Sequence, residues 1–297
     1  MLWLASAAAV QPAQAVEYGL SEYVLGLAIP MAGYTPPPGV YFTDIFYLYS
    51  GVWYKDTTKV NYNFVANGAI VNWVTDLDVL GGSLGFGVNV PFGGVRNTAL
   101  VPTVGPSGFR QQALADSVNA IGNVEVATYI GWQEREHHWN AVLIGFIPSG
   151  AYDPNRIAFT SLNRPAIDIK GAYTFLSLQT GFEASAALGL TINTVNAATN
   201  YQSGAELHFE WALNQHFPFG LAAGVGGYFY QQVTDDGGPT ATLGPYRGRV
   251  AAIGPLLSYT FKADAQELTL SGRWFHEFAA EKRVQGDAIF ASLSFRL

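Results

Sequence analysis

The chain has 297 residues, of which 49% are hydrophobic and 12% charged, with a formal net charge of −7. Soluble domains carry about 25% charged residues, so this composition argues against an ordinary water-exposed surface. The acidic balance offers no basic patch for a nucleic acid, and the lack of cysteine excludes disulfides and a cysteine nucleophile.

Residues 1–15 have the pattern of a secretory signal peptide. An apolar run from Leu2 to Val10 is followed by Ala13-Gln14-Ala15, a small-residue cleavage pattern. The run is shorter than the roughly 20 apolar residues of a transmembrane helix, and no later run reaches that length. We therefore expect an exported chain that starts at Val16 and has no helical membrane anchor.

Residues 16–39 are apolar but do not alternate. They contain Ile29-Pro30-Met31 and three consecutive prolines, Pro36–Pro38, and proline fixes φ and lacks an N–H group, so an extended, irregular segment is expected. It either trails in the periplasm or plugs the lumen of a barrel. The plug is favoured because an apolar segment would otherwise lie exposed in water.

From residue 40 onwards, apolar and polar side chains alternate in about twelve segments with the period of two of a β-strand. The expected strands are 40–54, 68–79, 83–95, 122–133, 138–148, 166–175, 182–193, 205–213, 219–234, 247–261, 267–279 and 287–297.

The connections between these segments alternate in length. The short ones are 80–82, 134–136, 176–179, 214–218 and 262–266, and the long ones are 55–65, 96–120, 149–164, 194–203 and 235–246. Outer-membrane barrels have short periplasmic turns and long extracellular loops. The sequence therefore predicts residues 40–297 as an all-β, transmembrane, antiparallel up-and-down β-barrel of about 12 strands with both termini in the periplasm. Residues 111–118 are expected to form a short helix over its mouth.

The last strand supports this fold. Ile289, Leu293 and Phe295 share one face, and Phe290 and Ser292 lie on the other, which suits lipid on one side and water on the other. A half-buried strand of a soluble sandwich is the alternative, but a sandwich has no reason to sort its connections by length. The chain ends in Leu297 where such barrels usually end in Phe or Trp, and Phe295 keeps that pattern for the barrel-assembly machinery.

The same alternation predicts which side chains face the lumen, because a charge facing lipid costs a few kcal/mol near the midplane. The inward candidates are Glu125, Asp168, Lys170, Glu183, Glu206, His208, Glu210, Tyr228, Tyr230, Arg249, Arg273 and Phe290. They either line a path for a solute or form a stabilising polar core. Mixed signs in a narrow lumen favour salt-bridged filling over a wide aqueous pore.

Alternation fails in 138–148 and around Gly254-Pro255, where a bulge is expected. Gly254-Pro255 and Pro148 would interrupt their strands. Such interruptions are candidate openings through which an apolar solute leaves sideways into lipid.

Other chemistry has weaker support. Gly82–Gly87 opens a strand rather than a helix, so it lacks the helix N-terminus that binds phosphate. His137 and His138 are adjacent on a strand and face opposite ways, which disfavours a metal site. An outer-membrane phospholipase needs a paired histidine and serine facing lipid, but His208 faces inward and the strand of His276 offers no serine on its outward side.

Five motifs resemble the outer-membrane family named for the meta-pathway of phenol degradation, over nearly the whole mature chain. They are Tyr18–Gly26, Pro36–Phe42, Pro148–Asp153, Asn193–Gly204 and Gln232–Gly237. The resemblance implies a monomeric barrel in the outer membrane of a Gram-negative bacterium, with a role in uptake of aromatic or other hydrophobic compounds and no catalytic residues.

The expected function is a passive channel for small hydrophobic compounds, with the lipid bilayer, the solute and the barrel-assembly machinery as partners and no cofactor or metal. The rival function is a structural or surface-interaction barrel with a closed lumen.

Overall fold

The computed structural model describes residues 17–55, 58–105, 108–241 and 247–297, so the predicted signal peptide lies outside the described residues. Within these ranges no helix is long and apolar enough to cross a bilayer. The elements are η1 (Glu17–Gly19), β1 (Gly39–Lys55), β2 (Thr58–Val79), β3 (Gly82–Gly105), β4 (Gly108–Ile121), β5 (Val124–Glu134), β6 (His137–Ile147), β7 (Ala166–Leu176), β8 (Phe182–Asn193), β9 (Val195–Asn196), β10 (Tyr201–Gln202), β11 (Glu206–His216), β12 (Leu221–Gln232), β13 (Arg249–Ala263), β14 (Gln266–Glu281) and β15 (Gln285–Arg296).

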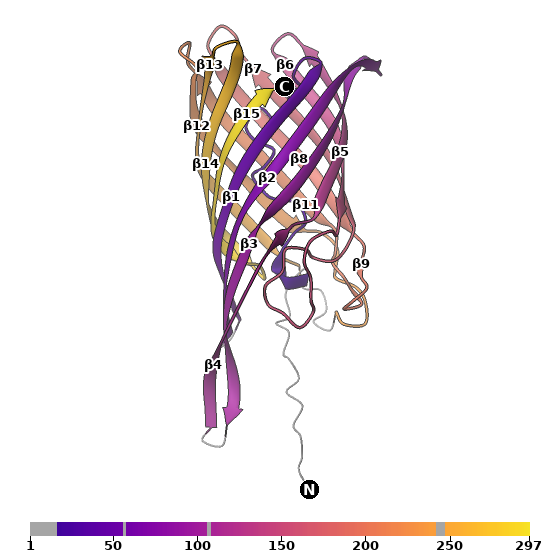
Figure 1. Ribbon diagram of the computed structural model, residues 1–297, viewed down its shortest axis with the longest axis vertical. Helices are drawn as coiled ribbons and strands as arrows, with labels where there is room; N and C mark the ends of the chain where they lie inside the picture. Colours follow the sequence, from indigo (N-terminus) through magenta and orange to yellow (C-terminus); the bar gives the residue numbers. More distant parts are fainter. Residues whose placement is uncertain (1–16, 56–57, 106–107, 242–246) are drawn as a thin grey trace.

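Twelve of these strands form a closed antiparallel barrel in the order β1-β2-β3-β5-β6-β7-β8-β11-β12-β13-β14-β15 (Figure 1). The barrel closes where β15 pairs with β1, from Tyr41 opposite Arg296 to Val52 opposite Gln285. Closure leaves no open edge in the membrane, where an unpaired backbone group would cost several kcal/mol. The twelve-stranded barrel predicted from the sequence is confirmed.

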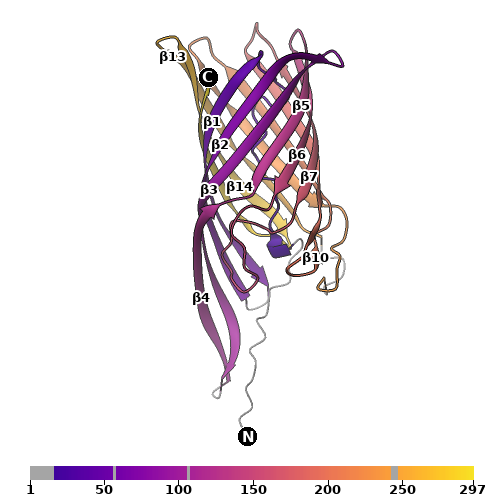
Figure 2. The ribbon, with the colours of Figure 1, turned by 45° about the vertical axis from the view of Figure 1, so that its right-hand side comes forward.

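The short turns lie at the end of the barrel that carries the carboxyl terminus, at the top of Figure 1. The long connections lie at the opposite end, together with β4 and the small β9–β10 hairpin (Figures 1 and 2). By the rule that short turns are periplasmic, the carboxyl terminus faces the periplasm.

Two predicted loops are strands instead. Residues 111–118 belong to β4, which pairs with β3 from Phe92 opposite Ile121 to Gly105 opposite Gly108, so the helix predicted there is wrong. This β3–β4 hairpin projects beyond the barrel (Figure 2). The connection predicted at 55–65 is also wrong, because β1 and β2 stay paired up to Lys55 and Thr58.

The barrel wall is continuous at Gly254-Pro255, although these two residues are absent from the pairs that β13 makes with β14. Strand β13 runs through both residues and pairs there with Val225 and Gly226 of β12. A side chain at Gly254 would collide with the carbonyl oxygen of Trp274 on β14, so the strands are in close contact. The predicted sideways exit at this point is therefore wrong. The irregularity expected here lies elsewhere, because the register between β13 and β14 shifts between Arg249 and Ala251.

Strand β6 is regular, so the bulge expected in it is also wrong. Its pairing with β5 and β7 continues in one register. Its inward residues include the buried side chains of Ile144 and Phe146. The polar alternation fails there because the inward face of β6 is apolar over Val142, Ile144 and Phe146. Pro148 lies just beyond the end of β6 and interrupts no strand.

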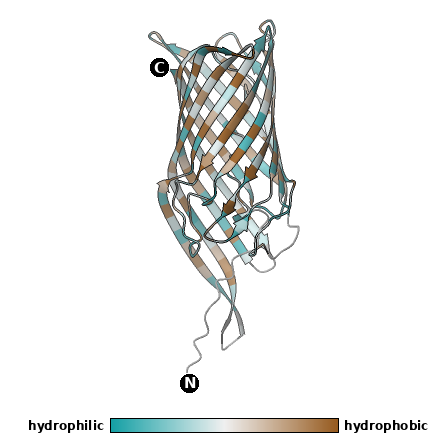
Figure 3. Cartoon of the chain, turned by 90° about the vertical axis from the view of Figure 1, so that its right-hand side faces the viewer, coloured by the Kyte–Doolittle hydropathy of each residue, from teal (hydrophilic) through white to brown (hydrophobic). Residues whose placement is uncertain are grey.

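The outer face of the barrel is an apolar band with one charged exception on β1. Hydrophobic residues recur along the barrel strands in Figure 3, and those facing outward from β1 include Phe42, Phe46 and Leu48. Asp44 faces the same way, opposite the outward Leu293 and Ala69. Its two carboxylate oxygens accept hydrogen bonds from Asn67 Nδ2 at 3.1 and 3.2 Å.

We expect Asp44→Leu to stabilise the barrel by about 1–2 kcal/mol, because an acidic side chain within the lipid band is unfavourable. Reversible urea unfolding from lipid vesicles measures the change. The control is Asp287→Leu, since Asp287 lies nearer the loop end and bonds Trp274 and His276. A loss of stability in Asp44→Leu would contradict the expectation and show that the carboxylate has a favourable partner in the membrane.

Candidate functional site: the lumen cavity and its plug

Residues 17–38, here called the plug, run through the lumen. At the loop end, the backbone N–H of Glu17 donates to Ser203 Oγ at 3.0 Å, and at the other end the plug leads into β1. Tyr23, Leu25 and Ile29 of the plug are at most 6% exposed. The expectation of two periplasmic termini is therefore corrected for the described chain, because Glu17 lies at the end opposite the carboxyl terminus.

Inward polar side chains of the wall bind the backbone of the plug. Glu210 Oε2 accepts the N–H of Ala28 at 3.0 Å, and Glu183 Oε1 accepts the N–H of Met31 at 2.8 Å. Arg273 donates to the carbonyl oxygen of Ile29. These bonds satisfy backbone groups that an irregular buried segment cannot satisfy itself.

A second contact joins the plug to β7 and β11. The ring of Tyr23 stacks on the ring of His208 with centroids 3.8 Å apart. His208 Nε2 lies 2.8 Å from Asp168 Oδ2, and Lys170 Nζ donates to the Tyr23 hydroxyl at 3.5 Å. His208 and Asp168 are at most 1% exposed, so this histidine packs against the plug and does not face lipid.

A third contact anchors the outer end of the plug to Arg164, which lies in the β6–β7 loop and is fully buried. Its guanidinium lies 3.7 Å from Glu17, 3.9 Å from Glu22 and 3.9 Å from Glu206. It also donates to Asn193 Oδ1 at 3.0 Å. One cation therefore holds two plug carboxylates and one wall carboxylate together.

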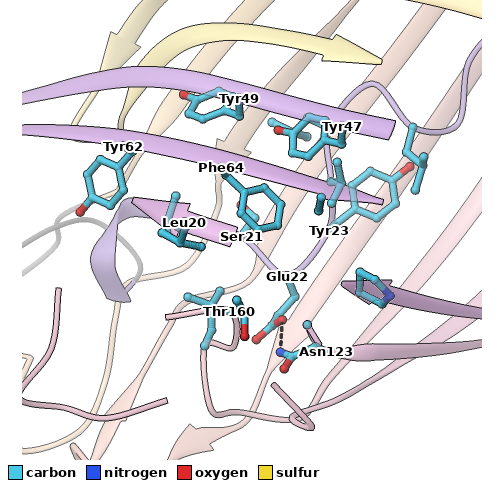
Figure 4. Close-up of a pocket in the computed structure, with 18 of the residues that line it drawn as sticks. Leu20, Ser21, Glu22, Tyr23, Tyr47, Tyr49, Tyr62, Phe64, Asn123 and Thr160 are labelled. Carbon is cyan, nitrogen blue, oxygen red and sulfur yellow. Dashed lines mark hydrogen bonds between the residues drawn. The ribbon is translucent and has the colours of Figure 1, made fainter. Parts of the chain in front are cut away.

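Between the plug and strands β1–β3 lies a cavity of about 230 Å³, here called the lumen cavity. In Figure 4, Leu20, Ser21 and Glu22 of the plug lie across from Tyr47 and Phe64 of the wall. Nine aromatic side chains line it, namely Tyr23, Tyr47, Tyr49, Tyr62, Phe64, Phe146, Phe159, Tyr228 and Phe290. A cavity of roughly 150 Å³ suffices for benzene, so this one suits a single-ring molecule.

The polar groups of the lumen cavity are bonded to neighbours. Asn123 Nδ2 donates to Glu22 at 2.7 Å (Figure 4). The hydroxyls of Tyr49 and Tyr228 donate to Glu277 at 2.7 and 2.8 Å. Apolar surface with a few polar groups is the usual character of a small-molecule site.

The periplasmic half of the lumen has a different character. A second cavity of about 920 Å³ lies there, lined by residues that include Thr43, Asn72, Asn140 and Ser294. Asn140 donates to the plug carbonyl of Ala32 at 2.8 Å. The plug therefore separates an outer aromatic compartment from an inner polar one.

The structure places eleven of the twelve inward candidates inside the barrel. Glu125, Tyr228 and Phe290 line the lumen cavity, and Tyr230 lies under the guanidinium of Arg283 at 4.0 Å. The residues that contact the plug or its Arg164 anchor are Lys170, Glu183, Glu206, His208, Glu210 and Arg273. Asp168 is held by His208 and Thr191 behind this contact layer.

Arg249 is the exception and its inward placement is corrected. Val250, Ala252 and Leu256 of β13 are buried inward, so the odd-numbered Arg249 faces outward. Near the loop end it reaches water, where it lies 2.5 Å from Glu281 with about half of its side chain exposed.

The sequence interpretation missed most of the cavity wall. Tyr47 and Tyr49 share the odd-numbered face of β1 with the buried Ile45. The alternation along this strand was sufficient to predict that both tyrosines face the lumen. Tyr62 had no such signal, because it fell in a segment predicted as loop.

The outward histidine lacks the order that a serine hydrolase needs. His276 Nδ1 lies 3.0 Å from Asp287 Oδ1, and the strand register places Ser50 on the far side of Asp287. A catalytic triad needs the histidine between the serine and the acid. Among the described residues, no group of His, Cys, Asp and Glu has the arrangement of a metal site.

The family model described as "Putative MetA-pathway of phenol degradation" matches residues 47–293. The chain belongs to this family. No match was found among curated proteins. The COG4313 outer membrane channel from Pseudomonas putida F1 has a similar fold, with a TM-score of 0.72 at 12% identity, covering 91% of this chain and 99% of that one.

Two further solved structures are less similar. A Pseudomonas aeruginosa FadL homologue has a TM-score of 0.42 at 9% identity and covers 86% of this chain and 87% of its own. The outer membrane protein OmpT of Vibrio cholerae has a TM-score of 0.40 at 10% identity and covers 87% and 96%.

The family, the closed barrel and its apolar outer band place the protein in the outer membrane of a Gram-negative bacterium. The lipid bilayer is therefore its environment.

Proposed function

We propose that the protein is a passive channel for small hydrophobic compounds, aromatic ones among them, and that the lumen cavity is the binding site of the solute. The observation that carries this proposal is the row of nine aromatic side chains around a space of single-ring size. A barrel that served only as a rigid support would gain stability by filling that space, because empty volume in a core is destabilising.

In this proposal the plug is the gate. A solute in the lumen cavity meets Tyr23, Leu25 and Leu27 of the plug before it reaches the polar compartment. Passage therefore requires the plug to move, and the hydrogen bonds to Glu183 and Glu210 set how readily it moves. The outer membrane channel with a similar fold agrees with transport but does not specify the solute.

The rival function, a surface-interaction barrel with a closed lumen, is favoured by the β3–β4 hairpin. This hairpin extends well beyond the barrel (Figure 2) and would present its strands to a partner outside the cell. The surface-interaction function does not involve the lumen cavity. A variant that fills the cavity therefore distinguishes the two functions.

Filling the lumen cavity should abolish uptake. Ala66 is 5% exposed, faces inward from β2 and lines the cavity, so Ala66→Phe would occupy the space of the solute. The matched control is Ala69→Phe, because Ala69 faces outward from the same strand opposite Asp44. A deletion strain carrying each variant is tested for uptake of radiolabelled aromatic and aliphatic carbon sources at limiting concentration.

We expect Ala69→Phe to restore uptake of at least one compound and Ala66→Phe to fail. If the deletion strain takes up every compound as fast as its parent, the channel function is wrong and the surface-interaction function replaces it.

A further inference from the structure

We infer that the lumen cavity selects solutes by the sign of their polar group: it binds an apolar molecule that donates a hydrogen bond, such as an alcohol or an amine, and rejects a carboxylate. This inference rests on the proposed function, because it concerns the solute of the same cavity. It follows from three oxygen atoms and from the charges around them.

The first oxygen belongs to Asn97 of β3, which is 1% exposed and lines the lumen cavity. Its Nδ2 donates to the carbonyl oxygen of Ile157 at 2.5 Å. That bond fixes the orientation of the amide, because a carbonyl oxygen can only accept. Oδ1 is left buried without a hydrogen-bond partner.

Asn89 is fixed in the same way. Its side chain hydrogen-bonds the carboxyl of Glu125, and since Oδ1 takes part in no hydrogen bond the amide nitrogen is the donor. Its Oδ1 is buried and unpartnered, and the residue lines the lumen cavity. A third acceptor is Glu22 Oε1, which accepts no hydrogen bond and lies 3.9 Å from Arg164 Nε, whereas Oε2 of the same carboxyl accepts from Asn123.

Acidic groups outnumber basic ones around the lumen cavity. They are the carboxyls of Glu22, Glu125 and Glu277, against the guanidinium of Arg283. Arg283 is already engaged, since it donates to Ser21 Oγ at 2.8 Å and lies over the ring of Tyr230 at 4.0 Å. It also neutralises part of the charge of Glu277.

These features act together on a bound solute. A buried acceptor without a partner is unfavourable, so a solute that donates to it removes that cost as well as forming a bond. A solute carboxylate has no hydrogen to donate, and its charge would be buried in an apolar space beside three acidic side chains, with Arg283 already engaged, which costs several kcal/mol. An apolar solute without a polar group is bound only through its contacts with the aromatic side chains.

Three probes with one ring each separate these cases: toluene, benzyl alcohol and benzoate. Their binding to the full-length barrel in detergent is measured by saturation-transfer NMR with competition. We expect benzyl alcohol to bind roughly fivefold more tightly than toluene, the factor for one net hydrogen bond of about 1 kcal/mol. Benzoate should bind at least about tenfold more weakly than benzyl alcohol.

The variant Glu125→Gln tests the electrostatic part. Glutamine keeps an oxygen that accepts from Asn89 but removes the charge, so benzoate should gain affinity relative to benzyl alcohol. The matched control is Glu281→Gln, which removes the same charge outside the lumen, where Glu281 pairs with Arg249. It should leave the benzoate to benzyl alcohol ratio unchanged.

The outcomes distinguish this inference from the proposed function. If all three probes bind and benzoate equals benzyl alcohol, or if Glu125→Gln leaves the ratio unchanged, the selection by charge is wrong while the cavity remains a binding site. If none of the probes binds the wild-type barrel, and Ala66→Phe transports as the wild type does, the proposed function itself fails.

Discussion

A barrel that lacks the plug should conduct ions at least severalfold better than the wild-type protein in a planar bilayer. Barrels of eight strands are filled by their own side chains, whereas those of sixteen or more leave an aqueous channel. A twelve-stranded barrel lies between these limits, and here the plug occupies the space. Deleting residues 17–34 while keeping the prolines before β1 removes Tyr23, Leu25 and Ile29 from the lumen.

The deletion exposes inward residues that the plug now covers, so folding has to be checked first by heat-modifiable migration on a gel. A second variant keeps the whole chain. Glu183→Leu combined with Glu210→Leu removes the acceptors for the backbone N–H groups of Met31 and Ala28, and should raise the frequency of open events. Unchanged conductance in both folded variants would show that the plug does not block the lumen.

The barrel itself was predictable because its constraints are local. Alternation along each strand and the sorted lengths of the connections follow from lipid outside, water inside and a closed sheet. All twelve expected strands are present. The start of β2 and the end of β3 are each about ten residues from their predicted positions, because these outer parts leave the membrane, where the lipid no longer imposes a simple alternation.

The candidate site was less predictable. Parity correctly places Glu183 and Glu210 inside the barrel, but it cannot show that they bind the backbone of Met31 and Ala28, more than 150 residues away in sequence. The plug carries no alternation of its own, so nothing local fixes its path. Nothing in the sequence indicates that Arg164 is buried, because it lies in a loop, where an arginine is usually solvated.

The lumen of this barrel is therefore organised by its plug. Charged wall residues that would suit an aqueous pore instead bind an internal segment of the chain. What remains open to a solute is the aromatic space beside that segment. In the proposed function the gate and the binding site share Tyr23, which both stacks on His208 and lines the lumen cavity.

Replacing Arg164 should release the outer end of the plug. Removing one partner from a buried ion pair costs about 3–5 kcal/mol, because the remaining charge is left buried without compensation. In Arg164→Met three carboxylates, those of Glu17, Glu22 and Glu206, lose their common cation. We expect a thermal midpoint well below that of the wild type, and cleavage within the plug by a protease added on the loop side.

The defect should depend on pH. Burial raises the pKa of Glu17 above its ordinary value even with the guanidinium of Arg164 nearby. The buried site therefore favours the protonated, neutral form of this carboxyl. A raised native pKa means that its stabilising contribution is present in acid and is lost as the pH rises from about 4 through the native pKa. The thermal midpoint of Arg164→Met should therefore be closest to that of the wild type at pH 5 and furthest below it at pH 8. Arg164→Lys keeps the charge but loses the planar guanidinium that reaches Asn193 and Leu20. Its thermal midpoint should therefore lie between those of the wild type and Arg164→Met. If Arg164→Met resists the protease as the wild type does at pH 8, Arg164 does not hold the plug.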